Sequence, residues 1–138
     1  MMTLYEDGFL KLSYDATYDI LYVPCPHIQE FELLHIQKAL SIVVETLISY
    51  DIKRFLFDSS NSQIDLPAED HYHLIGQLIR GLMPSRLQKL ARVGSTDTMR
   101  ENSIERFLDN SEVQYTLPFK IQNFPSKAAA INWLIKEE

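Results

Sequence analysis

The spacing of apolar residues changes along the chain from the two-residue step typical of strands to the three- and four-residue steps typical of helices. Strand-like runs occupy residues 9–14 and 20–23, and the turn-forming residues 15–19 between them predict a β-hairpin. From about residue 29 to residue 50 the apolar side chains recur at helical spacing. The first part of the chain therefore predicts two paired strands followed by a long amphipathic helix.

Beyond residue 50, short apolar runs alternate with stretches of helical spacing. Three of the runs predict strands, at residues 53–58, 87–94 and within 113–122. Pro118 interrupts the last run, and since proline cannot donate to a strand ladder, this strand is expected at or near a sheet edge. Signals for the beginning of a helix stand at Pro67, at the capping-box residues 98–101, and at Pro125 or Ser126.

The predicted order of elements is β-β-α-β-α-β-α-β-α. An opening hairpin followed by alternating helices and strands predicts an α/β layered fold with a mixed, largely parallel sheet. We expect five strands and four helices, with the helices covering the faces of the sheet. Residues 1–138 contain no repeat or Gly/Ser-rich linker, so a single domain is expected.

Composition and charge limit the classes of protein to which the chain can belong. Hydrophobic residues make up 46% and charged residues 23%, the balance of a soluble globular domain. Cys25 is the sole cysteine, no apolar run approaches membrane-spanning length, and the acidic beginning of the chain does not resemble a secretory signal. We therefore expect a cytoplasmic protein without integral membrane association. The net charge of −6 disfavours nucleic-acid binding.

Three local strings carry a family resemblance that extends over the whole chain. They are Tyr14-Asp15 at the turn of the hairpin, the strand end Phe-Leu-Phe-Asp-Ser at 55–59, and Ala-Ile-Asn-Trp-Leu at 130–134. With the order of elements, they resemble the SpoIIAA-like (STAS-like) superfamily, specifically the small stand-alone STAS-like proteins of bacteria. The resemblance implies a SpoIIAA-like fold and a non-catalytic binding or regulatory role.

The resemblance also implies two alternative functions. Anti-sigma-factor antagonists of this fold are switched by phosphorylation of a serine in an Asp-Ser-Ser-Gly string. The corresponding string here is Asp58-Ser59-Ser60-Asn61, which makes Ser59 or Ser60 the phosphoacceptor and departs from the family pattern at Asn61. Lipid-transfer domains have a related layered architecture. That function requires a lined cavity of roughly several hundred Å³.

Two polar loops are the candidate binding site. In open α/β sheets, ligands bind beyond the carboxyl ends of parallel strands, near a switch in strand order. If the strands before them are parallel and adjacent, residues 58–61 and 94–97 converge at one sheet edge. The candidate residues are Asp58, Ser59, Ser60, Asn61, Ser95 and Thr96. The alternative is that these hydroxyls cap helices and that Asp58 binds loop amides.

A cluster of cations adds a second candidate feature. Residues 80–92 carry four basic side chains and no acidic one, among them Arg86 and Arg92. The segment is either a solvated helix end and loop or a small patch that binds an anion or a partner. Arg86 or Arg92 contributes charge to the candidate site only if the fold brings it there.

The residue patterns that would indicate a catalytic or metal-binding site are incomplete in this sequence, so they do not predict an enzyme. His71 and His73 are two residues apart, so they point to different faces of a helix. Cys25 and His27 lack an oxyanion-hole string and a third orienting residue, and no Gly-rich phosphate loop occurs. We expect no catalytic residue, metal or cofactor, and a protein partner or small ligand as the binding target. A homodimer is left open.

Overall fold

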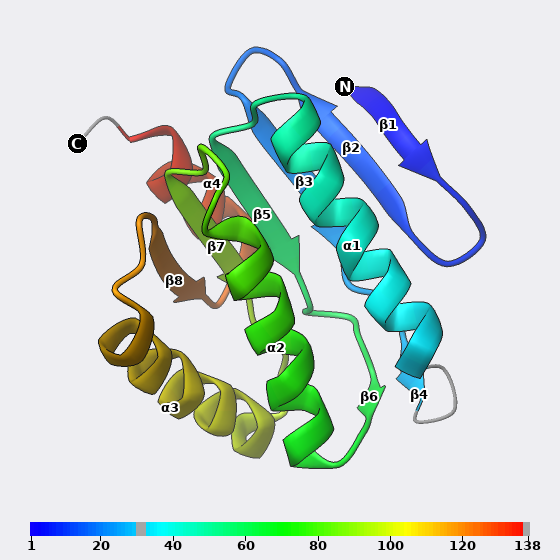
Figure 1. The fold of residues 1–138 in the computed structure, drawn as a ribbon, viewed down its shortest axis with the longest axis vertical. Coiled ribbons are helices and arrows are strands. Elements are labelled where there is room, and N and C mark those ends of the chain that lie inside the picture. Colours follow the sequence, from blue (N-terminus) through cyan, green and yellow to red (C-terminus); the bar gives the residue numbers. More distant parts are fainter. Residues whose placement is uncertain (30–32, 137–138) are drawn as a thin grey trace.

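A six-stranded mixed sheet forms the centre of the computed structural model (Figure 1), which describes residues 1–29 and 33–136, and of residues 111–115 the backbone alone. The strands are β1 (Met2–Glu6), β2 (Lys11–Asp15), β3 (Ile20–Pro24), β5 (Arg54–Asp58), β7 (Lys89–Val93) and β8 (Lys120–Phe124). They lie in the sheet in this same order. β1, β2 and β3 pair antiparallel, whereas β3, β5, β7 and β8 pair in parallel.

Four helices cover the sheet unequally. They are α1 (Leu33–Ser49), α2 (Ala68–Leu82), α3 (Thr98–Tyr115) and α4 (Lys127–Ile135). Figure 1 shows α1, α2 and α3 on one face and α4 behind the other face. Each of the first three helices connects one parallel strand to the next in the same direction, and right-handed crossovers then place all three on the same face. α4 follows β8 and covers the opposite face.

The two faces of the sheet bury two separate apolar cores. On β3, Leu21 and Val23 contribute to the larger core beneath α1 and α2, whereas Ile20 and Tyr22 contribute to the smaller core beneath α4. This division follows from the two-residue period of a strand, which sends successive side chains to opposite faces. Phe55 is the largest fully buried side chain and belongs to the larger core.

A second, two-stranded sheet lies beyond the carboxyl end of β3 and β5. It consists of β4 (Ile28–Gln29) paired in parallel with β6 (Ile64–Asp65). Ile28 packs with Ile36 of α1 and Leu74 of α2, so this small sheet extends the apolar layer past the end of the main sheet. The sequence analysis placed no strand in either segment.

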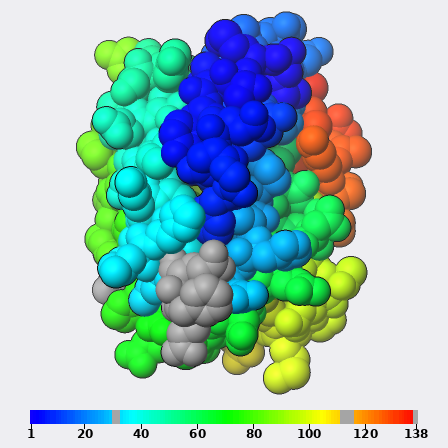
Figure 2. Space-filling view, turned by 90° about the vertical axis from the view of Figure 1, so that its right-hand side faces the viewer, coloured from blue at the N-terminus to red at the C-terminus, as the bar shows by residue number. Residues whose placement is uncertain are grey.

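The α/β class, the hairpin, the mixed sheet and the four helices are confirmed, but the predicted number of five strands is wrong. The additional strand is β1, which pairs with β2 along one edge of the molecule (Figure 2). The turn between β1 and β2 depends on Asp7, whose Oδ1 accepts hydrogen bonds from the amides of Phe9 and Leu10, each at 2.7 Å. Asp7-Gly8 is therefore a hairpin turn that allows the preceding residues to form a strand.

Two local assignments near α3 are also wrong. The predicted strand within 113–122 begins only at Lys120, because residues up to Tyr115 continue α3. β8 does occupy the sheet edge, as Pro118 indicated. The predicted capping box at 98–101 does not form. Asp97 caps the helix instead, with its Oδ1 3.1 Å from the amide of Arg100, and Glu101 turns toward the sheet.

A buried lysine joins β7 to the end of α4. The Nζ of Lys89 donates hydrogen bonds to the carbonyls of Trp133 and Lys136, each at 2.8 Å, and lies 5.0 Å from the centre of the Trp133 ring. The carbonyls at the end of a helix have no partner within the helix and attract positive charge. Lys89 therefore closes α4 in the way that a C-terminal cap would.

We expect Lys89→Met to destabilise the fold by about 2 kcal/mol, because methionine keeps the aliphatic stem but loses two charge-assisted hydrogen bonds. Urea unfolding followed by tryptophan fluorescence measures this difference, since Trp133 lies beside the substituted position. Lys38→Met, on the exposed side of α1, is the matched control and is expected to change stability by less than about 0.5 kcal/mol. Equal effects of the two substitutions would contradict the capping role of Lys89.

Candidate functional site

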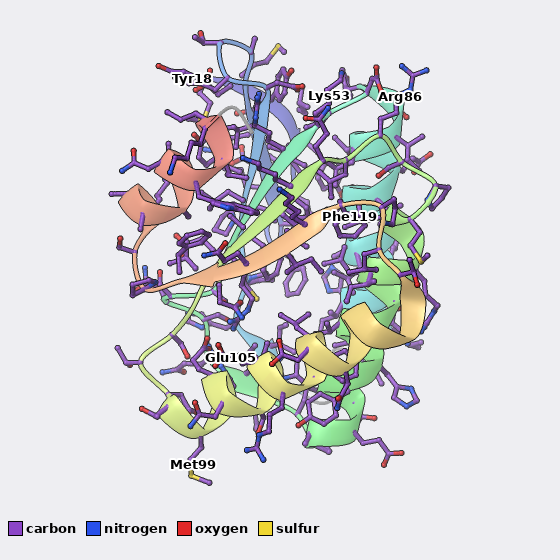
Figure 3. All side chains as sticks on the ribbon, turned by 90° about the vertical axis from the view of Figure 1, so that its left-hand side faces the viewer. Tyr18, Lys53, Arg86, Met99, Glu105 and Phe119 are labelled. Carbon is purple, nitrogen blue, oxygen red and sulfur yellow. The ribbon has the colours of Figure 1, made fainter. Side chains whose placement is uncertain are left out.

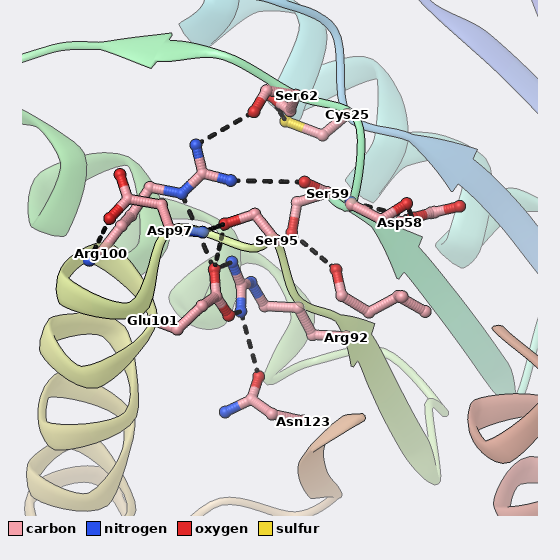
Figure 4. Close-up of polar contacts among 12 residues, drawn as sticks. Cys25, Asp58, Ser59, Ser62, Arg92, Ser95, Asp97, Arg100, Glu101 and Asn123 are labelled. Carbon is pink, nitrogen blue, oxygen red and sulfur yellow. Dashed lines mark hydrogen bonds and ion pairs between the residues drawn. The ribbon is translucent and has the colours of Figure 1, made fainter. Parts of the chain in front are cut away.

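An ion pair between β7 and α3 lies at the centre of the polar residues beyond the sheet (Figure 4). Arg92 of β7 and Glu101 of α3 make two parallel contacts, 2.6 Å from Nη1 to Oε1 and 2.9 Å from Nη2 to Oε2. The side chains are 11% and 21% exposed. Arg92 points toward α3 because it follows Leu90 by two residues on β7, and Leu90 belongs to the core on that face. Arg92 also approaches Asn123 of β8, at 3.4 Å.

A second arginine joins α3 to the loop after β5. Arg100 donates to the carbonyl of Ser62 at 3.1 Å and to the carbonyl of Ser59 at 3.3 Å. Its buried Nε has no hydrogen-bond partner among the residues that the structure describes, and it lies 3.7 Å from Oε2 of Glu101. The hydroxyl of Ser95 donates to the same carboxylate oxygen at 3.0 Å. Glu101 therefore receives contacts from the sheet, from its own helix and from the loop before that helix.

The two adjacent serines after β5 face different surroundings. Ser59 is 1% exposed, and its hydroxyl donates to the carbonyl of Val93 at 2.8 Å. Ser60 is partly exposed, and its hydroxyl donates to Oδ1 of Asp58 at 2.6 Å. Asp58 also accepts the amide of Ser60, at 3.0 Å. Asp58 thus binds a loop amide, as the alternative interpretation of this loop predicts, and at the same time orients an accessible hydroxyl.

An open groove of about 480 Å³ lies where the polar loops meet. It is lined by Ser60, Gly94, Ser95, Thr96, Glu101, Glu105, Asn123, Phe124 and Pro125. The predicted convergence of the loops at 58–61 and 94–97 is therefore confirmed, with the loop after β8 as a third wall. Strand order does not reverse here, because the strands of the six-stranded sheet lie in the order in which they follow along the chain. The groove opens instead between β7 and β8, whose following connections lead to α3 and α4 on opposite faces.

Some predicted site residues lie away from this groove. Asn61 is exposed and does not line it. Arg86 lies at the other end of the sheet, before β7, with Nη1 3.5 Å from Oδ2 of Asp51 (Figure 3). The four cations of 80–92 therefore do not form one patch, because Lys89 reaches α4 and Arg92 pairs with Glu101.

The sulfur and imidazole groups near the site are held in neutral forms. Burial raises the pKa of the Cys25 thiol, despite a hydrogen bond from Ser62 that lowers it. Burial, together with the charges of Arg92 and Arg100, lowers the pKa of His71 to about 4. The Nδ1 of His27 accepts the amide of Gln63 at 3.0 Å. At neutral pH both Cys25 and His71 are therefore uncharged.

An apolar cavity of about 90 Å³ lies on the inner side of the ion pair. Its wall contains Arg92, Ser59, Cys25 and His71, and the remainder is aliphatic and aromatic. The volume is well below the roughly several hundred Å³ that a lipid carrier requires. Arg92 thus borders the cavity, whereas its partner Glu101 borders the groove.

Sequence reasoning did not identify three residues of this network, which are Arg100, Glu101 and Asn123. A signal for Glu101 was present in Arg92, one of the two cations in the short buried strand β7. Such a residue requires a counter-charge from a neighbouring element when it is buried. The distance along the sequence gave no indication of which acid would supply it.

Comparisons with known proteins give a likeness of fold. No family model matches the chain, and no curated protein matches it. Among solved structures, the chain is similar to an uncharacterized protein of the DUF3478 family from Shewanella loihica PV-4, which has a SpoIIAA-like fold. The two are 10% identical, the match covers 95% of this chain and 98% of the other, and the TM-score is 0.47.

None of the helices in the described residues is both long and apolar enough to cross a membrane. Within the same residues, His, Cys, Asp and Glu side chains do not gather in threes in a way that could hold a metal ion.

The Arg92–Glu101 pair predicts a loss of stability in acid. Burial alone would raise the pKa of Glu101, but the hydrogen bonds and charge of Arg92, with Ser95, outweigh it and lower the pKa from 4.5 to about 2. Because the folded-state pKa is depressed, this contribution is present above about pH 4.5 and is lost as the pH falls toward about 2. We expect Glu101→Gln to reduce the free energy of unfolding by about 3 kcal/mol at pH 7.

Urea unfolding of the wild type and of Glu101→Gln at several pH values tests this prediction. The difference between the two proteins is expected to shrink as the pH falls below about 4.5. Glu105→Gln, one turn along α3 and exposed, is the control and should show little difference at any pH. A difference that is constant with pH would show that Glu101 does not act through its charge.

Proposed function

We propose that the protein is a non-catalytic binding domain of the STAS-like, regulatory kind, and that it recognises a protein partner or a small ligand in the groove beyond β5, β7 and β8. One observation carries this proposal. The groups that could perform chemistry are engaged or neutral beneath the groove, whereas the groove itself presents hydroxyl, amide and carboxylate groups suited to recognition.

The state of the three reactive groups supports a role in binding. A nucleophile requires a neighbouring base or a lowered pKa. The hydroxyl of Ser59 donates to a backbone carbonyl, which is not a base, and the raised pKa of Cys25 keeps its thiol protonated. His71, with a pKa of about 4, is a weak base at neutral pH.

The polar network supports binding in a second way, because it fixes the groove in one shape. The bidentate contact of Arg92 with Glu101 attaches α3 to β7, and Arg100 attaches α3 to the loop after β5. A site that is held in shape before the ligand arrives loses less conformational entropy on binding.

The charge around the groove indicates the kind of partner. Glu105 is an exposed acid in the groove wall, and Asp97 is exposed beside Thr96. Arg92 and Arg100 lie close by, but their hydrogen bonds go to Glu101 and to loop carbonyls. A neutral or positively charged group therefore meets less repulsion here than an anion does. We infer a partner that presents hydroxyl, amide or basic side chains.

Filling the groove is expected to abolish binding without unfolding the protein. Thr96→Tyr places a ring in the groove from an exposed position and leaves the contact of Ser95 with Glu101 intact. Ser41→Tyr, on the exposed side of α1, is the matched control. Immobilised wild-type protein and both variants are incubated with an extract of the source organism, and bound proteins and small molecules are identified by mass spectrometry.

We expect a stoichiometric component that binds the wild type and Ser41→Tyr and is at least tenfold reduced on Thr96→Tyr. Circular dichroism confirms that both variants fold. Equal recovery on Thr96→Tyr would place the binding site elsewhere. A substrate turnover that Thr96→Tyr removes would overturn the non-catalytic assignment.

A phosphorylation switch is a second candidate function, favoured by the position of one hydroxyl. Ser60 lines the groove and is partly exposed, whereas Ser59 is 1% exposed and bonded to Val93. A kinase therefore reaches Ser60 first. A phosphate at Ser60 would add about two negative charges next to Asp58 and break their hydrogen bond, so it would release a neutral or basic partner.

Incubation with kinases from the source organism, followed by peptide mass spectrometry, tests this switch. We expect modification of Ser60 in the wild type and in Ser59→Ala, and none in Ser60→Ala. The phosphorylated protein should bind the groove partner at least tenfold more weakly than the unmodified one. A peptide covering residues 58–62 that remains unmodified would count against the switch.

A further inference from the structure

The apolar cavity described above is separate from the groove and has its own walls. The sheet contributes Phe57 and Leu90, α2 contributes Ile75, and α3 contributes Ile104 and Leu108. Protein interiors are normally packed as densely as organic crystals, with few voids larger than a water molecule. A pocket of about 90 Å³ between the larger core and the cluster around Ile28 is therefore space that the side chains leave unfilled.

α1, α2 and α3 all line the cavity, and of these three helices α3 is the one attached mainly by polar contacts. Among the described side chains of α3, only Ile104 and Leu108 are buried. The ring of Phe107 stacks on Tyr72 of α2, with centres 4.9 Å apart, and Glu101 pairs with β7. An element with few buried apolar contacts opens more readily than a core helix does. A small molecule can therefore enter beneath α3 without disrupting the remainder of the core.

The polar part of the cavity wall carries no charge that is available to a ligand. Arg92 is neutralised by the two contacts with Glu101, and Ser59 donates to Val93. The thiol of Cys25 remains protonated because burial raises its pKa. Burying an additional ion in such a place is costly, because a buried charge requires a partner of opposite sign. The cavity therefore selects a neutral molecule.

One side chain in the wall can recognise a polar group on that molecule. His71 lines the cavity from the first half of α2, and no hydrogen bond to its imidazole is found among the described residues. A neutral imidazole has one N–H donor and one acceptor nitrogen. Either nitrogen can form a hydrogen bond with a hydroxyl, and the N–H can donate to a carbonyl.

We propose that this cavity is a second binding site, which takes a small neutral molecule with a branched or cyclic hydrocarbon body and a single hydroxyl or carbonyl bound to His71. A dry cavity of about 150 Å³ takes the six heavy atoms of benzene, so a cavity of about 90 Å³ accommodates roughly four or five heavy atoms. The site lies beneath α3, apart from the groove, so its occupation does not depend on the groove partner.

The test uses isobutanol as the neutral probe, isobutyrate as its charged counterpart and xenon as a purely apolar probe. Each is titrated into isotopically labelled protein, and methyl resonances are followed by NMR. We expect isobutanol and xenon to shift the methyl signals of Ile104 and Leu108, while those of Leu134 in the opposite core remain unchanged. Isobutyrate is expected to bind at least tenfold more weakly than isobutanol.

Two variants test the apolar space of the cavity and the hydrogen bond of His71 independently. Ile75→Phe fills the cavity and is expected to abolish binding of both isobutanol and xenon. Ile131→Phe adds the same atoms to α4 and should leave binding unchanged. His71→Leu is expected to weaken isobutanol binding about fivefold, the value of one hydrogen bond, and to leave xenon binding intact. Leu108→Phe replaces Ile75→Phe if that protein does not fold.

Cavity methyl signals that do not move with either isobutanol or xenon would overturn the proposal. Binding that persists in the filled variant would overturn it as well. Isobutanol affinity that is unchanged in His71→Leu would overturn the assigned role of His71. Thr96→Tyr should bind isobutanol normally, so a failure of the groove proposal and a failure of the cavity proposal give different results.

Discussion

The contact between Arg92 and Glu101 is the interaction on which the carboxyl end of this sheet depends. α3 buries little apolar surface of its own, so the ion pair sets the position of the helix relative to β7. The same pair forms the partition between two very different spaces, because Arg92 borders the apolar cavity and Glu101 borders the polar groove. Removing Glu101 would leave Arg92 as a buried charge without its counter-ion, whereas Glu101 would keep the nearby Arg100 if Arg92 were removed.

Burial divides the polar residues near this partition into two sets. Ser59 and Arg100 donate hydrogen bonds to backbone carbonyls of neighbouring segments and hold those segments in place. Ser60 and Thr96 lie on the outer side of the same loops and remain accessible. Neighbouring residues of the same chemical type therefore serve different purposes, one set as fixed support and the other as recognition surface.

The class of fold and the location of the groove could be predicted from the sequence, because both depend on local periodicity and on where strands end. The network inside the groove could not. Residues 98–101 match a capping box, yet Arg92 attracts Glu101 more strongly than a helix amide does, and Asp97 caps the helix in its place. Such a competition is decided by tertiary contacts. β1 was missed because its pairing with β2 depends on a turn that the side chain of Asp7 stabilises by accepting two backbone amides.

The strands of the main sheet follow one another in space as they do along the chain. During synthesis, each new strand can therefore be added to the exposed border of those already assembled, and none has to be inserted between two earlier neighbours. β8 and α4 leave the ribosome after the other strands of the main sheet, and within the described residues α4 is the helix that covers the second core. Until α4 emerges, the nascent chain exposes Leu56 and Ala91 to the solvent, which makes this a stage at which chaperones would be needed.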